Sequence, residues 1–240
     1  MPEKKPIYRT AGNFRTPISH QKDPSELNGL KIAILANGAA PRHRIPRQIL
    51  AEASFLVCCD GALAAARALG REPDFVVGDG DSIPPADRES LGDRFIHVAE
   101  QDTNDLDKAF RFTCSCASLP PASLRIAILG ATGLREDHTL GNIFRLSDFS
   151  ATVPGTAIYT DEGVFEAVRG ERTFAVRPGD AVSIFAPVPG TTVSSEGLQW
   201  PLAGVSLADL WSGTLNRATG ESFTLRTDGH PILVYRPYPT

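Results

Sequence analysis

The chain has 240 residues, 42% of them hydrophobic, and is therefore long enough to bury a core in one large domain or two small ones. Its net charge of −4 argues against a nucleic-acid-binding surface, which would carry a basic stripe. We expect no membrane span, because no apolar run approaches the roughly 18 residues that a span needs, and no secretory signal, because residues 1–28 contain no apolar h-region.

Residues 1–28 are charged and polar, and we expect them to form an arm with little intrinsic structure. The four cysteines fall in two close pairs, Cys58-Cys59 and Cys114-x-Cys116, and neither pair has the C-x-x-C spacing of a metal or redox site. Adjacent cysteines rarely bridge one another. We therefore expect buried, reduced thiols in a cytoplasmic protein.

From Lys31 to about Val153, short apolar runs alternate with segments that can form helices. Strands are expected at 31–36, 55–59, 74–77, 95–98 and 124–129, and helices at 46–53, 61–69, 84–91, 104–117 and 137–148. Strands that alternate with helices favour an α/β fold, in which a mainly parallel sheet carries helices on both faces. The near-continuous apolar character of the strands fits burial on both sides.

The pattern changes after Val153-Pro154-Gly155. Strand-length runs now recur between turns such as Pro189-Gly190, at 156–160, 164–168, 172–176, 181–186, 191–195, 222–226 and 231–236. That spacing is typical of an antiparallel β-sandwich or barrel. We therefore divide the chain into an arm (1–28), an α/β domain (29–153) and a β domain (154–240).

Glycines and acids follow four successive strands of the predicted sheet. They are Asp60-Gly61 after the second strand, 78–82 after the third, 100–105 after the fourth and 130–137 after the fifth. In parallel α/β sheets the ligand crevice lies outside the carboxyl ends of the strands. One Asp-Gly pair alone would fit an ordinary turn, but four such segments at one rim predict a binding site.

Asp79 and Asp81 stand two residues apart and repel each other unless a cation lies near them. In extended backbone their side chains would face the same way, and carboxylate oxygens bind Mg²⁺ together with water and phosphates. Asp105 could supply a third oxygen, although the helix dipole alone also favours an acid in a first turn. Since the chain has neither a Walker loop nor a G-x-G-x-x-G motif after a strand, we expect a magnesium–phosphate ligand held in another way.

Taken together, the motifs resemble those of the thiamine pyrophosphokinase (thiamin diphosphokinase) family. The matching segments are CDGA (59–62), PDFVVGDGDSI (73–83), QDTNDLDKA (101–109), GATGLREDHTLGNI (130–143) and SSEGLQWPL (194–202). The resemblance runs from about Lys31 to the C-terminus. It implies a Rossmann-like α/β catalytic domain followed by a thiamine-binding β-sandwich, in a homodimer with active sites between the subunits.

The resemblance also implies a reaction, in which the terminal diphosphate of ATP is transferred to the hydroxyl of thiamine and AMP is released, with Mg²⁺ as cofactor. Residues matched to the family's site fall into three sets: Asp79, Asp81 and Asp105 for Mg²⁺; Asp60, Gly61, Asn104, Arg135 and Asp137 for the nucleotide; Gln101, Trp200 and Asn216 for thiamine. Among these, Trp200 would reach the thiamine from the partner subunit.

The sequence departs from the family pattern at a few positions. Ala62 and Ala64 replace a glycine and an asparagine, Asn104 stands where the family has Thr or Ser, and Asn216 alone remains of a Ser-Asn-Thr segment. Two alternatives stay open, a diphosphokinase for another small alcohol and an inactive nucleotide- or thiamine-binding sensor. The three acids argue against the sensor, since binding alone rarely needs three carboxylates near a triphosphate.

Overall fold

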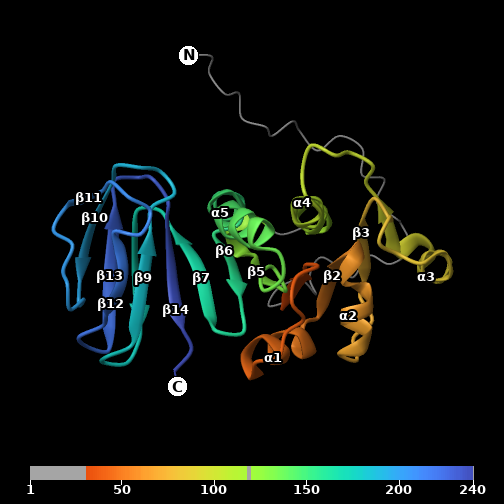
Figure 1. The fold of residues 1–240 in the computed structure, drawn as a ribbon, viewed down its shortest axis with the longest axis horizontal. Coiled ribbons are helices and arrows are strands. Elements are labelled where there is room, and N and C mark those ends of the chain that lie inside the picture. Colours follow the sequence, from red (N-terminus) through yellow and green to blue (C-terminus); the bar gives the residue numbers. More distant parts are fainter. Residues whose placement is uncertain (1–30, 118–119, 240) are drawn as a thin grey trace, which may run out of the picture.

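A computed structural model describes residues 31–117 and 120–239, and the arm predicted at residues 1–28 lies outside the described residues. The first half of the fold consists of β1 (Ile32–Leu35), α1 (Arg44–Glu52), β2 (Phe55–Cys59), α2 (Leu63–Ala68), β3 (Phe75–Gly78), α3 (Pro85–Leu91), β4 (Phe95–His97), α4 (Asp105–Cys116), β5 (Arg125–Leu129), α5 (Glu136–Thr152) and β6 (Gly155–Tyr159). Figure 1 shows α4 and α5 on one face of the sheet, and α1 and α2 on the other. The predicted α/β arrangement is confirmed.

The six strands of this half pair in parallel in the order β6-β5-β1-β2-β3-β4. Helices cover both faces, so a central strand must be apolar throughout, and all four residues of β1 are buried. The strand order reverses at β1: the chain steps outward through β2, β3 and β4, then returns to place β5 on the other side. In parallel α/β sheets such a reversal opens a crevice at the carboxyl ends of the two strands beside it, here β1 and β5, and ligands bind in that crevice.

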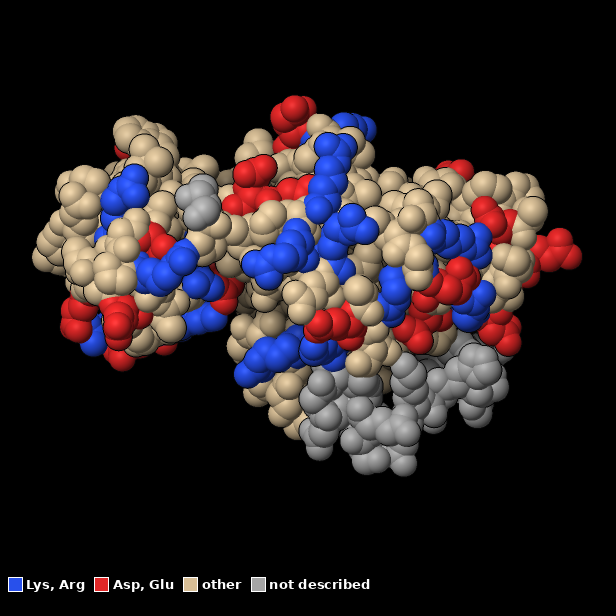
Figure 2. All heavy atoms as spheres, turned by 90° about the horizontal axis from the view of Figure 1, so that it is seen from below, with Lys and Arg blue, Asp and Glu red and all other residues tan. Residues whose placement is uncertain are grey.

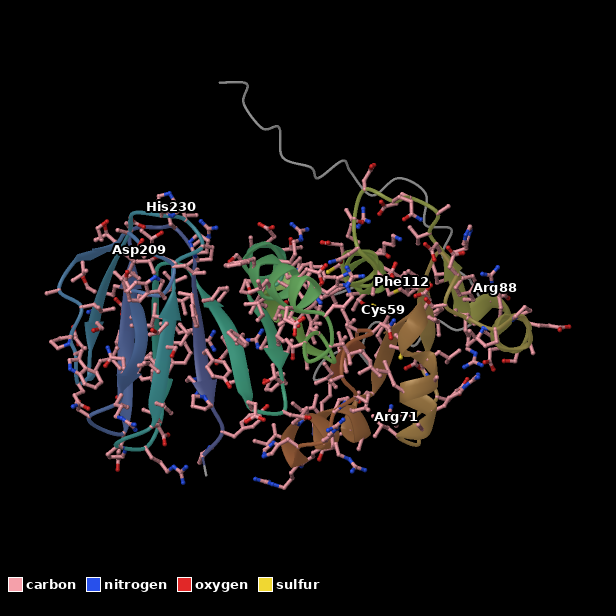
Figure 3. The ribbon with its side chains drawn as sticks, in the orientation of Figure 1. Cys59, Arg71, Arg88, Phe112, Asp209 and His230 are labelled. Atoms are coloured by element: carbon pink, nitrogen blue, oxygen red, sulfur yellow. The ribbon has the colours of Figure 1, made fainter. Side chains whose placement is uncertain are left out.

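Aromatic side chains fix α4 to the sheet and to α5. The Phe112 ring, labelled in Figure 3, meets the Phe75 ring of β3 edge-on at 5.0 Å between centroids. Two residues earlier, Phe110 stacks on Phe149 of α5 at 4.4 Å. Contacts of this kind hold a helix in one position, and the first turn of α4 carries several of the predicted site residues.

The second half of the fold is antiparallel. It consists of β7 (Gly163–Val168), β8 (Glu171–Ala175), β9 (Ala181–Phe185), β10 (Thr191–Glu196), β11 (Val205–Leu207), β12 (Gly213–Arg217), β13 (Ser222–Thr227) and β14 (Ile232–Pro237). A four-stranded sheet, β11-β10-β13-β8, packs against the other strands over a second apolar core, in which Phe174 and Phe223 stack at 4.9 Å. The expected antiparallel β region after the α/β region is confirmed.

One sheet runs through both halves. The strand expected at 156–160 is β6, which pairs in parallel with β5 and antiparallel with β7. From β7 the same sheet continues as β14, β9 and β12, giving ten strands. Continuous backbone hydrogen bonding therefore joins the two halves side by side, as Figure 1 shows.

Strands β11 and β12 were not predicted. The first has only three residues, and the second contains a register shift and Leu215, whose φ is 59°. Neither segment shows a run of alternating apolar and polar residues in the sequence. They are strands because they pair with β10 and β9 at the edges of the two sheets, so tertiary context outweighs local preference.

All four cysteines are free. Cys58 and Cys59 are buried as predicted, whereas Cys114 and Cys116 are only half-buried. Burial raises the pKa of the Cys58 thiol to about 12 and those of Cys114 and Cys116 to about 11. Raised pKa values keep these thiols protonated and unreactive at neutral pH.

Within the described residues, no helix is long and apolar enough to cross a membrane. On the face shown in Figure 2, basic and acidic side chains lie interspersed over both halves. Opposite charges often pair on the surface: Arg67, for example, forms ion pairs with Glu72 and Asp87.

Candidate functional site

A cavity of about 460 Å³ lies at the carboxyl ends of the parallel strands. The last residue of β2 and the segments that follow β1, β3, β4 and β5 contribute to its lining: Ala36, Asn37, Gly38, Cys59, Asp79, Gln101, Thr103, Asn104, Asp105, Leu106, Lys108, Ala131, Thr132, Leu134, Arg135, His138, Thr139 and Asn142. Five of the residues predicted from the sequence therefore meet at one cavity: Asp79, Gln101, Asn104, Asp105 and Arg135.

Asp79 is held in a defined orientation at this cavity. Its Oδ2 accepts a hydrogen bond from the Gln101 side-chain amide at 3.0 Å, and its Oδ1 accepts one from the backbone N–H of Asp81 at 3.1 Å. The Gln101 hydrogen bond is the main cause that lowers the pKa of Asp79 below its ordinary value. Asp79 is therefore ionised at neutral pH and suited to bind a cation.

Asp60 and Arg88 hold the loop that carries Asp79. The Asp60 side chain is buried and accepts from the backbone N–H groups of Gly61 at 2.6 Å and Gly80 at 3.0 Å. The Arg88 guanidinium, which Figure 3 labels on α3, donates to the Gly80 carbonyl at 2.6 Å. Both polar groups of Gly80 are thus bound, and its φ of 84° is one that glycine adopts without strain.

Asp60 does not itself line the cavity. Burial raises the pKa of its carboxyl, and the nearby charge of Asp105 raises it further. Gly61 does not line the cavity either. It leaves room for the Asn37 side-chain amide, which would lie 2.1 Å from a Cβ at this position. Both residues therefore position the loops around the cavity without lining it.

The N-terminus of α4 is tied to α5 beneath the cavity. Asn104 caps α4, its side-chain oxygen accepting from the backbone N–H of Asp107 at 2.9 Å. The Asn104 amide group donates to the Asn142 side chain at 3.2 Å, and Asn142 donates to the Ala131 carbonyl at 2.9 Å. This chain of hydrogen bonds links the segments after β4 and β5, and it therefore fixes the segment of Asp105 relative to the segment of Arg135.

Arg135 and Asp137 form an exposed ion pair at the mouth of the cavity. The guanidinium donates two hydrogen bonds to the carboxylate, at 2.6 and 3.1 Å. This pairing lowers the pKa of Asp137 to about 2. Arg135 lines the cavity, whereas Asp137 does not. Asp137 therefore acts on the cavity through the position of Arg135.

The three predicted metal-binding acids are not equally placed. Asp79 and Asp105 line the cavity, while Asp81 is exposed beside it. Among the described residues, no three His, Cys, Asp or Glu side chains form a group that could hold a metal ion. Two carboxylates at one cavity nevertheless fit Mg²⁺, because that ion usually takes one or two carboxylates and completes its coordination with water and phosphates.

Trp200 and Asn216 lie in the β half and do not line this cavity. Trp200 follows β10, and 53% of it is exposed. Asn216, on β12, is buried and binds the Trp200 backbone twice: its oxygen accepts from the Trp200 N–H at 3.1 Å, and its amide donates to the Trp200 carbonyl at 2.7 Å. Asn216 thus holds the segment that presents the indole to solvent.

The sequence analysis missed the contribution of the segment after β1 and of two polar residues inside helices, Lys108 and Asn142. Asn37 and Gly38 follow β1 as acids and glycines follow the other four strands, so the same rule would have found them. A Cβ on Gly38 would lie 2.4 Å from the Gly130 carbonyl oxygen, which shows how closely the β1 and β5 loops approach. Lys108 and Asn142 lie in the motif segments 101–109 and 130–143 but were given no role, because polar residues inside helices are ordinary.

A second, larger cavity of about 750 Å³ lies at the opposite ends of the strands. Its lining includes Lys31, Arg125 and Gly155, which stand at the starts of β1, β5 and β6. Size alone would favour this cavity as the ligand site. We favour the smaller one, because ligands of parallel α/β sheets bind at the carboxyl ends of the strands.

The fold and the cavity place the chain among Rossmann-like α/β proteins with a ligand crevice at the point where the strand order reverses. Residues 46–157 match the family model for the catalytic domain of thiamin pyrophosphokinase, and residues 163–235 match that for its substrate-binding domain. The chain belongs to the thiamin pyrophosphokinase family.

Individual relatives agree with this assignment. Thiamine pyrophosphokinase 3 of Oryza sativa subsp. japonica is 30% identical over 150 residues, which are 57% of this chain and 55% of that protein. Thiamine pyrophosphokinase 1 of the same plant is 31% identical over 149 residues, again 57% and 55%. The matched region thus spans about half the length of these curated relatives.

Solved structures share the fold over most of the chain. A thiamin pyrophosphokinase family protein from Enterococcus faecalis matches with a TM-score of 0.72 and 17% identity, over 87% of this chain and 99% of that one. Yeast thiamin pyrophosphokinase matches with a TM-score of 0.69 and 16% identity, over 86% of each chain.

Proposed function

We propose that this protein transfers the terminal diphosphate of ATP to the hydroxyl of thiamine, giving thiamine diphosphate and AMP. The match of both halves of the chain to the two domains of one family is the observation that carries the proposal. The acid-lined cavity at the carboxyl ends of the strands supports it, because a magnesium–nucleotide complex suits that site.

In this proposal the thiamine hydroxyl attacks the β-phosphorus of ATP, the bond to the α-phosphate breaks, and AMP leaves. Phosphoryl transfer of this kind depends on positioning and charge neutralisation. A Mg²⁺ ion, when bound, would supply positive charge that neutralises the phosphates. Asp79 and Asp105 would hold it from the cavity, with Asp81 as the third acid beside them.

The remaining residues take supporting roles. Arg135 binds phosphate oxygens at the cavity mouth, with Asp137 holding its guanidinium. Asn104 fixes the first turn of α4 beside the nucleotide. Asp60 and Gly61 shape the loops behind it, and Gln101, which holds Asp79, lies next to the thiamine.

We further propose a homodimer in which Trp200 of one subunit covers the cavity of the other. In Figure 1, β10 and β11, which flank Trp200, lie at one end of the molecule and β3 at the other. One chain therefore keeps the two parts of the predicted site apart, whereas a two-fold axis can bring them together. A cytoplasmic location would suit the four free cysteines.

An assay of AMP release tests the function. With ATP, thiamine and Mg²⁺ together, we expect AMP and thiamine diphosphate in equal amounts, and neither product in EDTA. Release of AMP only with another small alcohol would instead indicate a different diphosphokinase. Binding of both ligands without AMP release would indicate a sensor.

A further inference from the structure

Lys108 is a buried cation to which the proposed reaction gives no role so far. It lies near the start of α4 and lines the cavity, and its side chain is only 2% exposed. Its ammonium donates to Asp105 Oδ1 at 3.1 Å, while the Asp105 side chain is 41% exposed. A buried ammonium needs good partners to offset its lost hydration, and one half-solvated carboxylate compensates that loss only in part.

The position near the start of a helix adds to this cost, because the N-terminal end of a helix is electropositive. An ammonium has three donors, and Asp105 is the one acceptor found for Lys108 among the described residues. Two donors are therefore left for a ligand in the cavity. The charge of Lys108 also reaches Asp79, whose pKa is lowered mainly by Gln101 and to a smaller extent by Lys108.

We propose that Lys108 is a phosphate-binding residue, whose ammonium contacts the transferred diphosphate between Asp79 and Asp105. This inference rests on the proposed function and adds a contact of the protein itself to the charge neutralisation by the metal. A compact ammonium on a buried stem suits this task, because the packing of the stem holds a point charge in a fixed position at the wall of the cavity.

The test is a double-mutant cycle on the binding of ATP in EDTA, measured by calorimetry on the full chain. Lys108→Met removes the charge but keeps the length, and Asp105→Asn removes the acid that Lys108 contacts. We expect Lys108→Met to weaken ATP binding at least about tenfold, and by the same factor when Asp105 is already Asn. Arg47→Met, the same charge loss at an exposed position on α1 outside the cavity, should change binding less than about twofold.

Two results would overturn the assignment: unchanged binding in Lys108→Met, or a loss that disappears in the Asp105→Asn background. The second would mean that Lys108 only supports Asp105. If the unmutated chain binds ATP only with Mg²⁺, Lys108→Met is compared with it in Mg²⁺ and the same tenfold loss is expected. Failure of the unmutated chain to bind ATP both in EDTA and in Mg²⁺ would overturn the proposed function, so the two failures are distinguishable. If Lys108→Met does not fold, Lys108→Gln carries the same expectations, because its polar terminus tolerates the site better.

Discussion

The two halves of the molecule present their predicted site residues in opposite ways. In the α/β half, polar side chains line a cavity and are tied to one another by hydrogen bonds, as Asp79 is to Gln101. In the β half, large apolar side chains face solvent: Trp200 is 53% exposed, Trp211 68% and Leu215 80%. None of these three lines either of the two cavities described above.

This difference indicates what each half needs in order to form its part of the predicted site. The strand ends of a parallel sheet converge, so the α/β half builds its polar cavity within one chain. The exposed Trp200 indole, whose backbone Asn216 holds, would bury its apolar surface only when another surface covers it. In the proposed homodimer, the α/β half would therefore supply the charges of the site, and the exposed apolar side chains of the β half would lie against the second subunit.

The largest effect on activity is expected from removing a charge at the cavity of the α/β half. Asp79→Asn keeps the size of the side chain but removes a metal-binding charge, so kcat/KM for diphosphate transfer should fall at least about a hundredfold. Steady-state AMP release at saturating Mg²⁺ measures it. Asp93→Asn, the same change at an exposed position outside the cavity, is the control and should keep normal activity. Equal activity in the two variants would contradict the placement of the metal.

Mixing subunits tests whether the two halves meet across a dimer. Asp79→Asn and Trp200→Ala should each be nearly inactive alone. After co-refolding in equal amounts, half of the dimers are mixed, and each mixed dimer has one site with neither change, so about a quarter of the normal activity should return. If mixed dimers form and the mixture stays inactive, the site is built within one chain.

A smaller effect is expected where the β half holds its indole. Asn216→Ala removes three hydrogen bonds, two to the Trp200 backbone and one from the Arg217 N–H. The free energy of unfolding should fall by about 1–3 kcal/mol, and KM for thiamine should rise about tenfold while KM for ATP stays constant. Urea unfolding and steady-state kinetics measure the two effects. A parallel rise in KM for ATP would show that the variant disturbs the α/β half instead.

The smallest effect concerns pH and the loop before α4. Partial burial acts to raise the pKa of Glu100, but hydrogen bonds from Thr103, Arg111 and the Asp102 N–H outweigh it and lower the pKa to about 2. A lowered pKa in the folded state gives a stabilisation that is complete above about pH 4.5 and is lost as the pH falls toward 2. Glu100→Gln should therefore reduce the decline of the melting temperature across that range. An unchanged decline would mean that Glu100 does not stabilise this loop.

Much of the α/β half could be predicted from the sequence, because its signals are local. A central strand such as β1 is buried on both faces and is apolar throughout, and α4 begins at a side chain that caps it, Asn104. Since the carboxyl ends of parallel strands share one edge, the order of the strands along the chain was enough to bring Asp79, Asp105 and Arg135 together. The β half was less predictable, since β11 and β12 owe their conformation to the strands they pair with.

The sequence by itself thus determined the class of fold, the edge of the sheet at which the candidate site lies and most of the residue types there. Only the tertiary structure decided which polar groups face the cavity. The sequence does not show that the Lys108 side chain is buried at the cavity, nor that the Asn216 amide binds the Trp200 backbone. The reason is physical: local pattern specifies the element in which a side chain lies, whereas its direction and partners depend on neighbours from distant parts of the chain.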